Sequence, residues 1–163
     1  MRWAPLVERG PVLDVACGTG RHARFFREKN LEVVAVDRDD RALPGGIRFV
    51  KADLEGGGAW PFAGQRFGAV IVTNYLHRPL FPHLVESLAE GGVLIYETFM
   101  SGNEKFGRPS NPQFLLRPGE LLQAFGELAV AGFEQGRVER PKTAVIQRLC
   151  ALRGEAEKVR IAP

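Results

Sequence analysis

Short apolar runs alternate with helical patterns along the chain, and this alternation predicts a sheet of parallel strands connected by helices. The runs are rich in β-branched residues and lack strict polar alternation, which is typical of strands covered on both faces. Five runs are expected to form the central strands: Val12–Ala16, Leu31–Val36, Ile47–Lys51, Ala69–Thr73 and Val93–Thr98. Two more, Leu128–Val138 and Thr143–Leu152, are expected to form a C-terminal antiparallel pair.

Three segments between these runs have the spacing of amphipathic helices. Arg21–Lys29 places an alanine and a phenylalanine on one inward stripe, and Leu80–Glu90 repeats leucine and valine at helical intervals before a pair of glycines. Pro118–Phe125 has proline in its first turn, where a missing N–H costs nothing. The connection Ala52–Gly68 is rich in glycine and has room for little regular structure.

The composition predicts one domain. A chain of 163 residues with 45% hydrophobic residues can bury a single core, so residues 1–153 are expected to form one domain and residues 154–163 a frayed tail. The apolar runs are shorter than the roughly 20 residues of a membrane helix, and the first residues lack an apolar signal core, which favours a cytoplasmic location without membrane contact. Cys17 and Cys150 have no metal-ligand spacing and are expected to be reduced, and no metal site is predicted.

The charge of the chain raises nucleic acid as a partner without favouring it. The net charge is +3 and the pI about 9.1, and clustered cations bind phosphates. In the last quarter of the chain, however, seven Lys and Arg residues are interleaved with four Glu residues, which is typical of a solvated mixed-charge surface.

The first predicted strand runs directly into a glycine-containing turn. Residues 12–20 read VLDVACGTG, an apolar strand followed by a turn and then a predicted helix. Glycine lets the backbone approach a ligand closely, and a helix N-terminus presents N–H groups beside it. A turn of this kind also occurs without a ligand, so the turn alone does not establish a site.

Three acidic residues add the specificity that the turn lacks. Asp14, Asp37 and Asp53 lie at or just after the ends of three consecutive predicted strands. The carboxyl ends of parallel strands share one edge of the sheet, where α/β folds bind their ligands. Asp14 suits a cationic group, and Asp37 is placed to accept hydrogen bonds from a ribose diol.

A dinucleotide site is the alternative. Residues 18–23, GTGRHA, fit the loose G-x-G-x-x-A fingerprint, and Asp37 follows at a suitable distance. An acid four residues before Gly18 sits poorly beside a pyrophosphate, and 163 residues leave no room for a separate catalytic domain. An adenosine with a zwitterionic, cationic tail fits the acids better.

The segments VLDVACGTG, VVAVD, ADLE and VTNYL resemble the successive motifs of the class I S-adenosylmethionine-dependent methyltransferases, and together they cover Val12 to Phe99. The resemblance implies a doubly wound α/β fold with a seven-stranded, mostly parallel sheet whose last strand is antiparallel. More loosely, the stretches Tyr96–Phe99 and Arg117–Leu121 resemble small bacterial members described as tellurite-resistance-like, a label from which no substrate follows.

The resemblance also implies which residues hold S-adenosylmethionine. The methionine part is expected against the first turn, the ribose on Asp37, adenine near Asp53 and Leu54, and the sulfonium beside the residues after the fourth strand. The full predicted set is Asp14, Ala16, Cys17, Gly18, Gly20, Asp37, Arg38, Asp53, Leu54, Asn74 and Tyr75. Two residues depart from the family pattern: Ala16 stands where the first glycine is usual, and Gly68 where many members carry aspartate.

The acceptor is predicted to be a small molecule. The loop Asn74-Tyr75-Leu76-His77 lacks the two prolines of enzymes that methylate DNA base amines, which disfavours that activity. An RNA or protein acceptor, or a non-catalytic domain that only binds the cofactor, remains open. The oligomeric state is not predicted.

The acceptor is expected among residues that end the fourth and fifth strands. Tyr75, His77 and Glu97 are the predicted catalytic residues, and Arg78 is expected to bind an anionic group. The turn-rich segment Met100–Arg117 is predicted to be a mobile lid, with a rigid connection packed by two phenylalanines as the alternative. It supplies two further predicted substrate-binding residues, Asn103 and Arg108. The aromatic pair Trp60 and Phe62 is expected in the core rather than around adenine.

Overall fold

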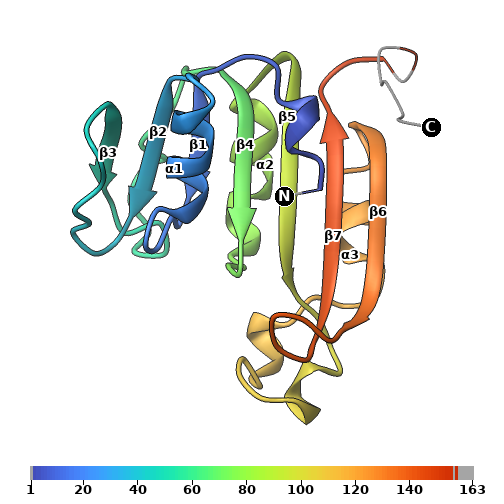
Figure 1. Ribbon diagram of the computed structural model, residues 1–163. Coiled ribbons are helices and arrows are strands. Elements are labelled where there is room, and N and C mark those ends of the chain that lie inside the picture. The colour runs from blue at the N-terminus through green and yellow to red at the C-terminus, as the bar shows by residue number, and fades with distance from the viewer. Residues whose placement is uncertain (1, 156, 158–163) are drawn as a thin grey trace.

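A computed structural model describes residues 2–155 and 157 of the chain. Its centre is a seven-stranded sheet with the order β3-β2-β1-β4-β5-β7-β6 (Figure 1). The strands are β1 (Val12–Val15), β2 (Val33–Asp37), β3 (Ile47–Lys51), β4 (Phe67–Thr73), β5 (Leu88–Phe99), β6 (Ala129–Val138) and β7 (Ala144–Leu152). Strands β1 to β5 pair in parallel, whereas β7 pairs antiparallel with both β5 and β6. The predicted fold class and the antiparallel last strand are therefore confirmed.

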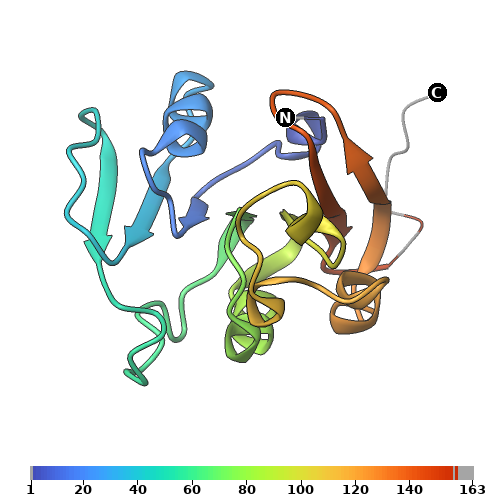
Figure 2. The same ribbon diagram turned by 90° about the horizontal axis from the view of Figure 1, so that it is seen from below.

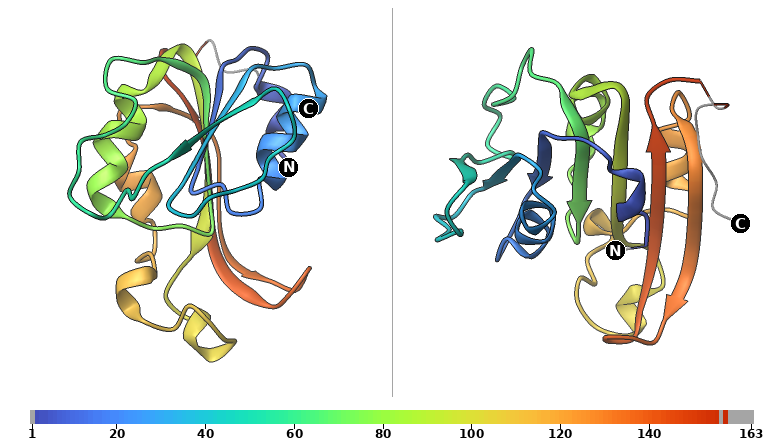
Figure 3. Two further views of the ribbon diagram at one scale, coloured as in Figure 1. Left: turned by 90° about the vertical axis from the view of Figure 1, so that its left-hand side faces the viewer. Right: turned by 45° about the horizontal axis from the view of Figure 1, so that its top comes forward.

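Helices cover both faces of the sheet unequally. Helix α1 (Arg21–Glu28) lies on one face, and α2 (Phe81–Glu86) and α3 (Glu120–Ala124) lie on the other (Figure 3). The N-terminal segment, with the 3₁₀ turn η1 (Ala4–Leu6), lies on the α1 face in front of β5 and β7. The remaining 3₁₀ turns are η2 (Arg78–Leu80), η3 (Asn103–Lys105) and η4 (Pro112–Phe114). Within the described residues, no long helix covers β7 and β6 on the α1 face.

The helix predicted over Leu80–Glu90 is wrong in its second half. The helical segment ends at Glu86, and β5 already begins at Leu88. The amide of Phe67 donates to the carbonyl of Ser87 at 2.8 Å, and Leu88 is fully buried where it pairs with Phe67. A short apolar repeat fits a buried strand as well as a helix, so the pairing with β4 decides the outcome. The other strand ends lie within two residues of the predicted ones, and α3 is shorter than predicted.

The end of the chain only partly tests the predicted tail. Residues 154 and 155 follow β7, whereas residues 156 and 158–163 lie outside the described residues. Within the described part, no helix combines the length and apolar character needed to cross a membrane.

Gly68 departs from the family pattern for a steric reason. Its amide donates to the carbonyl of Pro11 at 2.8 Å, so the segment before β1 crosses directly over the start of β4. A Cβ at residue 68 would overlap the carbonyl oxygen of Arg9 and lie 2.9 Å from its carbonyl carbon. Backbone atoms cannot move aside cheaply, so this crossing requires glycine.

Candidate functional site

The turn after β1 is built from left-handed backbone. Ala16, Gly18 and Gly20 have φ values of 52°, 55° and 73°. Glycine adopts this conformation without a Cβ penalty, whereas alanine pays a steric cost. Ala16 therefore takes the conformation that a glycine would take, and its methyl group lines a pocket.

Asp37, the last residue of β2, accepts hydrogen bonds from this turn. Its Oδ2 accepts from the amide of Gly18 at 2.8 Å, and its Oδ1 accepts from the amide of Asp39 at 3.1 Å and from Nη2 of Arg41 at 3.3 Å. Burial alone would raise the pKa of Asp37, but the two amides and the guanidinium outweigh it and hold the pKa below its usual value. Asp37 is therefore ionised at neutral pH.

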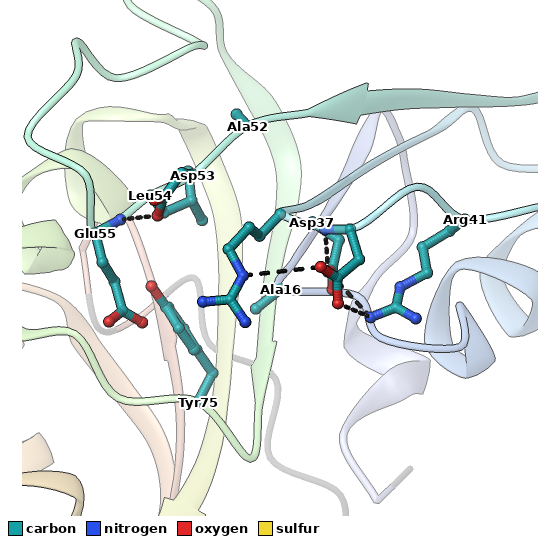
Figure 4. Close-up of a pocket in the computed structure, with 10 residues that line it drawn as sticks. Ala16, Asp37, Arg41, Ala52, Asp53, Leu54, Glu55 and Tyr75 are labelled. Atoms are coloured by element: carbon teal, nitrogen blue, oxygen red, sulfur yellow. Dashed lines mark hydrogen bonds and ion pairs between the residues drawn. The ribbon is translucent and has the colours of Figure 1, made fainter.

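Asp37 borders an open pocket of about 280 Å³, here called the acidic pocket, at the ends of β1, β2 and β3 (Figure 4). Its lining brings together six of the predicted cofactor residues with four not predicted: Ala16, Asp37, Arg38, Asp39, Arg41, Ala52, Asp53, Leu54, Glu55 and Tyr75. Asp53 is held by its own loop, because its Oδ1 accepts from the amide of Glu55 at 2.9 Å. Four carboxylates against two guanidinium groups make this pocket favourable for a ligand with a positive charge.

Tyr75 reaches the acidic pocket from the loop after β4. Figure 4 shows its phenol near Glu55. Burial and the carboxylates of Glu55 and Asp53 raise the pKa of Tyr75 far above neutrality. The phenol therefore stays protonated and acts as a hydrogen-bond donor, not as a base.

A second pocket, of about 270 Å³ and here called the basic pocket, lies at the end of β5. Figure 2 views this edge, where the loop after β5 comes beside the β6–β7 end of the sheet. The charged residues that line it are Arg21, Glu97, Arg108, Arg140, Lys142 and Arg148. A wider groove of about 500 Å³, lined by Trp3, His22 and Phe25 among others, continues from it along the α1 face and shares Arg21, Glu97 and Arg148 with it.

The two pockets meet at the loop after β4. Tyr75 lines the acidic pocket, and its neighbour Asn74, with a left-handed φ of 54°, lines the basic pocket. The structure thus places an acidic and a basic pocket on opposite sides of a single peptide unit.

Comparison with known proteins identifies the family of the domain that carries the acidic pocket. The model of a family described as the methyltransferase domain matches residues 12–92, which contain the glycine turn and all three predicted acids. Residues 12–92 form a methyltransferase domain of the class I S-adenosylmethionine-dependent kind. S-adenosylmethionine is its cofactor, and the pocket residues fit that group: the turn leaves open space beside Gly18, Asp37 is ionised, and the lining is acidic.

Relatives of this methyltransferase act on different acceptors. A malonyl-[acyl-carrier protein] O-methyltransferase from Pseudescherichia vulneris is 33% identical over an alignment of 114 residues that covers 61% of this chain and 44% of that protein. The chain thus spans less than half the length of this curated relative. Among solved structures, TehB from Haemophilus influenzae superposes with a TM-score of 0.76 at 14% identity, over 94% of this chain and 60% of TehB.

A third relative shows the fold in a complex. The 1,6-didemethyltoxoflavin-N1-methyltransferase from Burkholderia thailandensis, with its acceptor and S-adenosylhomocysteine bound, superposes with a TM-score of 0.66. It is 19% identical, over 94% of this chain and 75% of that chain. At this identity the likeness supports the fold alone.

Asp14 and Cys17 of the methyltransferase lie beneath the turn rather than on a pocket wall. Asp14 is 1% exposed, and its Oδ2 accepts from the amide of Ala23 at 2.9 Å, so it fixes the start of α1. Burial raises the pKa of Asp14 to about 7 and that of the Cys17 thiol to about 12. Their contact with the methionine part stays a prediction. Both cysteines are free and buried, as expected.

The structure places the residues of the predicted acceptor cluster apart from one another, and their roles stay predictions. Arg78 pairs with Glu120, with Nε 2.6 Å from Oε1 and Nη2 3.1 Å from Oε2, and it also donates to the carbonyls of Gln113 and Leu115. All three guanidinium nitrogens are engaged on the α2–α3 side, so Arg78 anchors a loop. Glu97 faces the basic pocket on the other side of the sheet, paired with Arg148 at 2.6 Å. His77 precedes η2 and lines none of the described pockets.

The predicted lid segment is anchored at both ends. Met100 pairs with Leu116 in an isolated bridge, and both are buried. Asn103 is 2% exposed, donates to the carbonyl of Pro109 at 3.0 Å and accepts from the amide of Val145 at 3.1 Å. Asn103 is therefore a structural residue on the pocket wall, whereas Arg108 is exposed there. Opening of the lid stays a prediction, and these contacts restrict it to the middle of the segment.

Several aromatic and histidine residues have structural partners. Trp60 and Phe62 are buried in the core as expected, with the indole N–H donating to the hydroxyl of Ser87 at 3.0 Å. His83 stacks on Trp60. His22 lies 3.1 Å from the hydroxyl of Thr73, and burial lowers its pKa to about 4, so it is neutral at physiological pH.

Sequence reasoning missed most of the basic pocket. Arg140, Lys142 and Arg148 were interpreted as part of a solvated surface because acids are interleaved with them. The turn between β6 and β7 separates the charges in space: Glu139 pairs with Arg137, while Arg140 and Lys142 face the pocket. Their clustering around a predicted hairpin turn was the available signal.

Proposed function

We propose that this methyltransferase transfers the methyl group of S-adenosylmethionine to a small-molecule acceptor bound in the basic pocket. The observation that carries the proposal is the junction at Asn74 and Tyr75, where the acidic pocket adjoins a second cavity of similar size. A donor pocket and an acceptor pocket separated by one peptide unit are what a direct transfer requires. A cavity of about 270 Å³ favours a small molecule over a folded macromolecule.

The chain's own residues supply binding and orientation. The ionised Asp37 and the loop of Asp53 would hold the adenosine, and the protonated Tyr75 would donate a hydrogen bond at the junction. The bound cofactor supplies an electrophilic methyl group on a positively charged sulfur. Because the leaving group is already activated, holding the acceptor in line can supply much of the rate, and a dedicated base is not required.

The named relatives support an acceptor of modest size. One acts on a malonyl group carried by a protein, and another on 1,6-didemethyltoxoflavin. An RNA acceptor and a non-catalytic cofactor-binding domain are the rival outcomes of the test below.

The test measures cofactor binding and transfer separately. Titration calorimetry with S-adenosylhomocysteine is expected to show saturable binding at one site, stronger than that of NAD. Release of S-adenosylhomocysteine is then followed with panels of small carboxylates, phosphates, amines and thiols and with RNA. If S-adenosylhomocysteine does not bind, the proposal is refuted. Tight binding of S-adenosylhomocysteine without turnover on any panel supports the non-catalytic domain. Turnover on RNA alone supports an RNA methyltransferase.

A further inference from the structure

The basic pocket has a strong excess of positive charge. Five cationic side chains line it, Arg21, Arg108, Arg140, Lys142 and Arg148, together with one carboxylate, that of Glu97. The acidic pocket has the opposite balance. Two adjoining cavities of opposite charge point to two ligands of opposite charge.

Arg148 contributes little of this excess. It lies between two acids of the neighbouring strands, with Nε 2.6 Å from Glu97 and Nη1 3.2 Å from Glu134. Glu134 also pairs with Arg2. The two arginines and two glutamates of these ion pairs, which extend across β5, β7 and β6, have no net charge. Arg148 therefore lines the pocket without adding to its positive charge.

The four other cations lack such partners. Among the described residues, no carboxylate lies within ion-pair distance of Arg21, Arg108, Arg140 or Lys142, and Arg21 contacts the ring of His22 instead. Arg108 comes from the loop after β5, whereas Arg140 and Lys142 come from the β6–β7 turn. Two separate elements thus place positive charges around one cavity. These charges repel one another, and a bound anion would offset that repulsion.

The walls between these cations are apolar. Phe99 at the end of β5, Phe106 in the following loop and Ile146 of β7 line the same cavity. Such a combination, an apolar surface with a few convergent polar groups, is typical of a small-molecule site. It differs from a nucleic-acid surface, where cations extend along a broad face.

We propose that the basic pocket recognises the methyl acceptor by an oxyanion, a carboxylate or a phosphate, held by Arg108, Arg140 and Lys142, with an apolar part against Phe99 and Phe106. This inference rests on the proposed function, since it assigns the chemical class of that acceptor. Guanidinium groups bind both oxyanions through paired N–H donors, and an ammonium group binds them as a point charge. The oxyanion serves as an anchor, which leaves the nucleophilic atom free to lie toward Asn74.

The experiment uses three probes of one shape: phenylacetate, phenyl phosphate and the uncharged phenylacetamide. Their binding to the full chain is measured by calorimetry or NMR titration, with and without saturating S-adenosylhomocysteine. We expect at least one anionic probe to bind about tenfold or more tightly than the amide, because charge-assisted hydrogen bonds are the stronger class. The better anion then distinguishes a carboxylate from a phosphate acceptor. Binding should weaken as salt is raised, since the cations are exposed.

Charge-matched variants locate the site. The double variant Arg140→Gln with Lys142→Gln is expected to weaken binding of the anionic probe by about tenfold or more. Adding Arg108→Gln is expected to weaken its binding further. The control pair, Arg24→Gln with Arg66→Gln, removes the same charge from exposed residues that line none of the described pockets, and should leave binding within about twofold. All variants should keep their affinity for S-adenosylhomocysteine and their melting temperature.

The outcomes separate the two proposals. Equal affinity for the amide and both anions overturns the oxyanion anchor, as does an equal effect of the pocket pair and the control pair. A short single-stranded RNA that binds through the same cations far more tightly than either probe also overturns it, in favour of nucleic acid. Failure of the native chain to bind S-adenosylhomocysteine refutes the proposed function instead, because the anionic probes are also titrated without it.

Discussion

Asn74 and Tyr75 are adjacent in the chain, yet they line different pockets: Asn74 the basic pocket and Tyr75 the acidic one. Asn74 has a left-handed φ of 54°, which turns the backbone just after the end of β4. Asparagine adopts this conformation more readily than most residues. The peptide between them is the point where a donor and an acceptor bound in the two pockets would meet.

This divergence predicts separable effects on binding. Tyr75→Phe removes a phenol hydroxyl from the acidic pocket. It should weaken the binding of S-adenosylhomocysteine by up to about tenfold, the range of a single hydrogen bond. Asn74→Gly keeps the left-handed turn and should leave cofactor affinity within about twofold while it raises the KM of the acceptor. Calorimetry and steady-state kinetics on both variants check this. Equal loss of cofactor affinity in both would mean that the junction does not divide the pockets.

Asp37 is predicted to hold the cofactor ribose. Asp37→Ala should weaken S-adenosylhomocysteine by about 1.5–3 kcal/mol, because a charge-assisted acceptor is lost. Asp37 also holds the amides of Gly18 and Asp39, so Asp37→Asn, which retains an acceptor, tests whether structure or charge is responsible. Asp40→Ala removes an exposed carboxylate paired with Lys51 and serves as the control. Unchanged affinity in Asp37→Ala would remove the ribose assignment.

Asp14 is predicted to make folding stability depend on pH. Its folded pKa of about 7 lies above the ordinary aspartate value of 3.8, so the folded state favours the protonated acid. Its contribution to stability is therefore present below about pH 4 and is lost as the pH rises through about 7, by on the order of 4 kcal/mol in all. Asp14→Asn can still accept from the amide of Ala23 and should abolish this loss.

The difference between the native protein and Asp14→Asn is the quantity to measure, by denaturant unfolding from pH 4.5 to 8. His22 has a lowered folded pKa, so its own contribution falls as the pH drops below its unfolded value and opposes the trend. That contribution is common to both proteins and cancels in the difference. A difference that stays constant across the range would contradict the buried, neutral Asp14.

The success of sequence reasoning here depended on how local each feature is. The strands β1 to β3 and their terminal acids are each contained in a few consecutive residues, so the pattern alone placed them. The start of β5 was missed because Leu84 and Leu88 suit a helix face, and only pairing with β4 distinguishes the two states. The role of Arg78 was missed because its partner Glu120 lies 42 residues away, and no local rule relates the two positions.

Gly68 is predicted to be irreplaceable for packing rather than for function. Gly68→Ala should lower the free energy of unfolding by about 1–3 kcal/mol or more, since its methyl group would overlap the backbone of Arg9. Gly58→Ala is the matched control, because a Cβ at residue 58 meets no atom within 4 Å. Thermal and urea unfolding compare the two. Similar stabilities would mean that the segment before β1 can move away from β4 at little cost.

Arg78 is predicted to act on stability and not on the acceptor. Glu120 is 5% exposed, and burial alone would raise its pKa, but the Arg78 guanidinium and the amide of Arg117 hold it below its usual value. Arg78→Gln should therefore cost about 1–2 kcal/mol of unfolding free energy at neutral pH, discounted because Arg78 is partly exposed. An acid with a lowered folded pKa, such as Glu120, stabilises the fold above its unfolded pKa. The difference in unfolding free energy between Arg78→Gln and the native protein should therefore shrink as the pH falls below about 4.5.

The double variant Arg78→Gln with Glu120→Gln isolates the contribution of this ion pair. Kinetics of Arg78→Gln below its melting temperature should show an unchanged acceptor KM. A KM that rises at least about tenfold in Arg78→Gln, with stability intact, would restore Arg78 as the residue that binds the acceptor's anion.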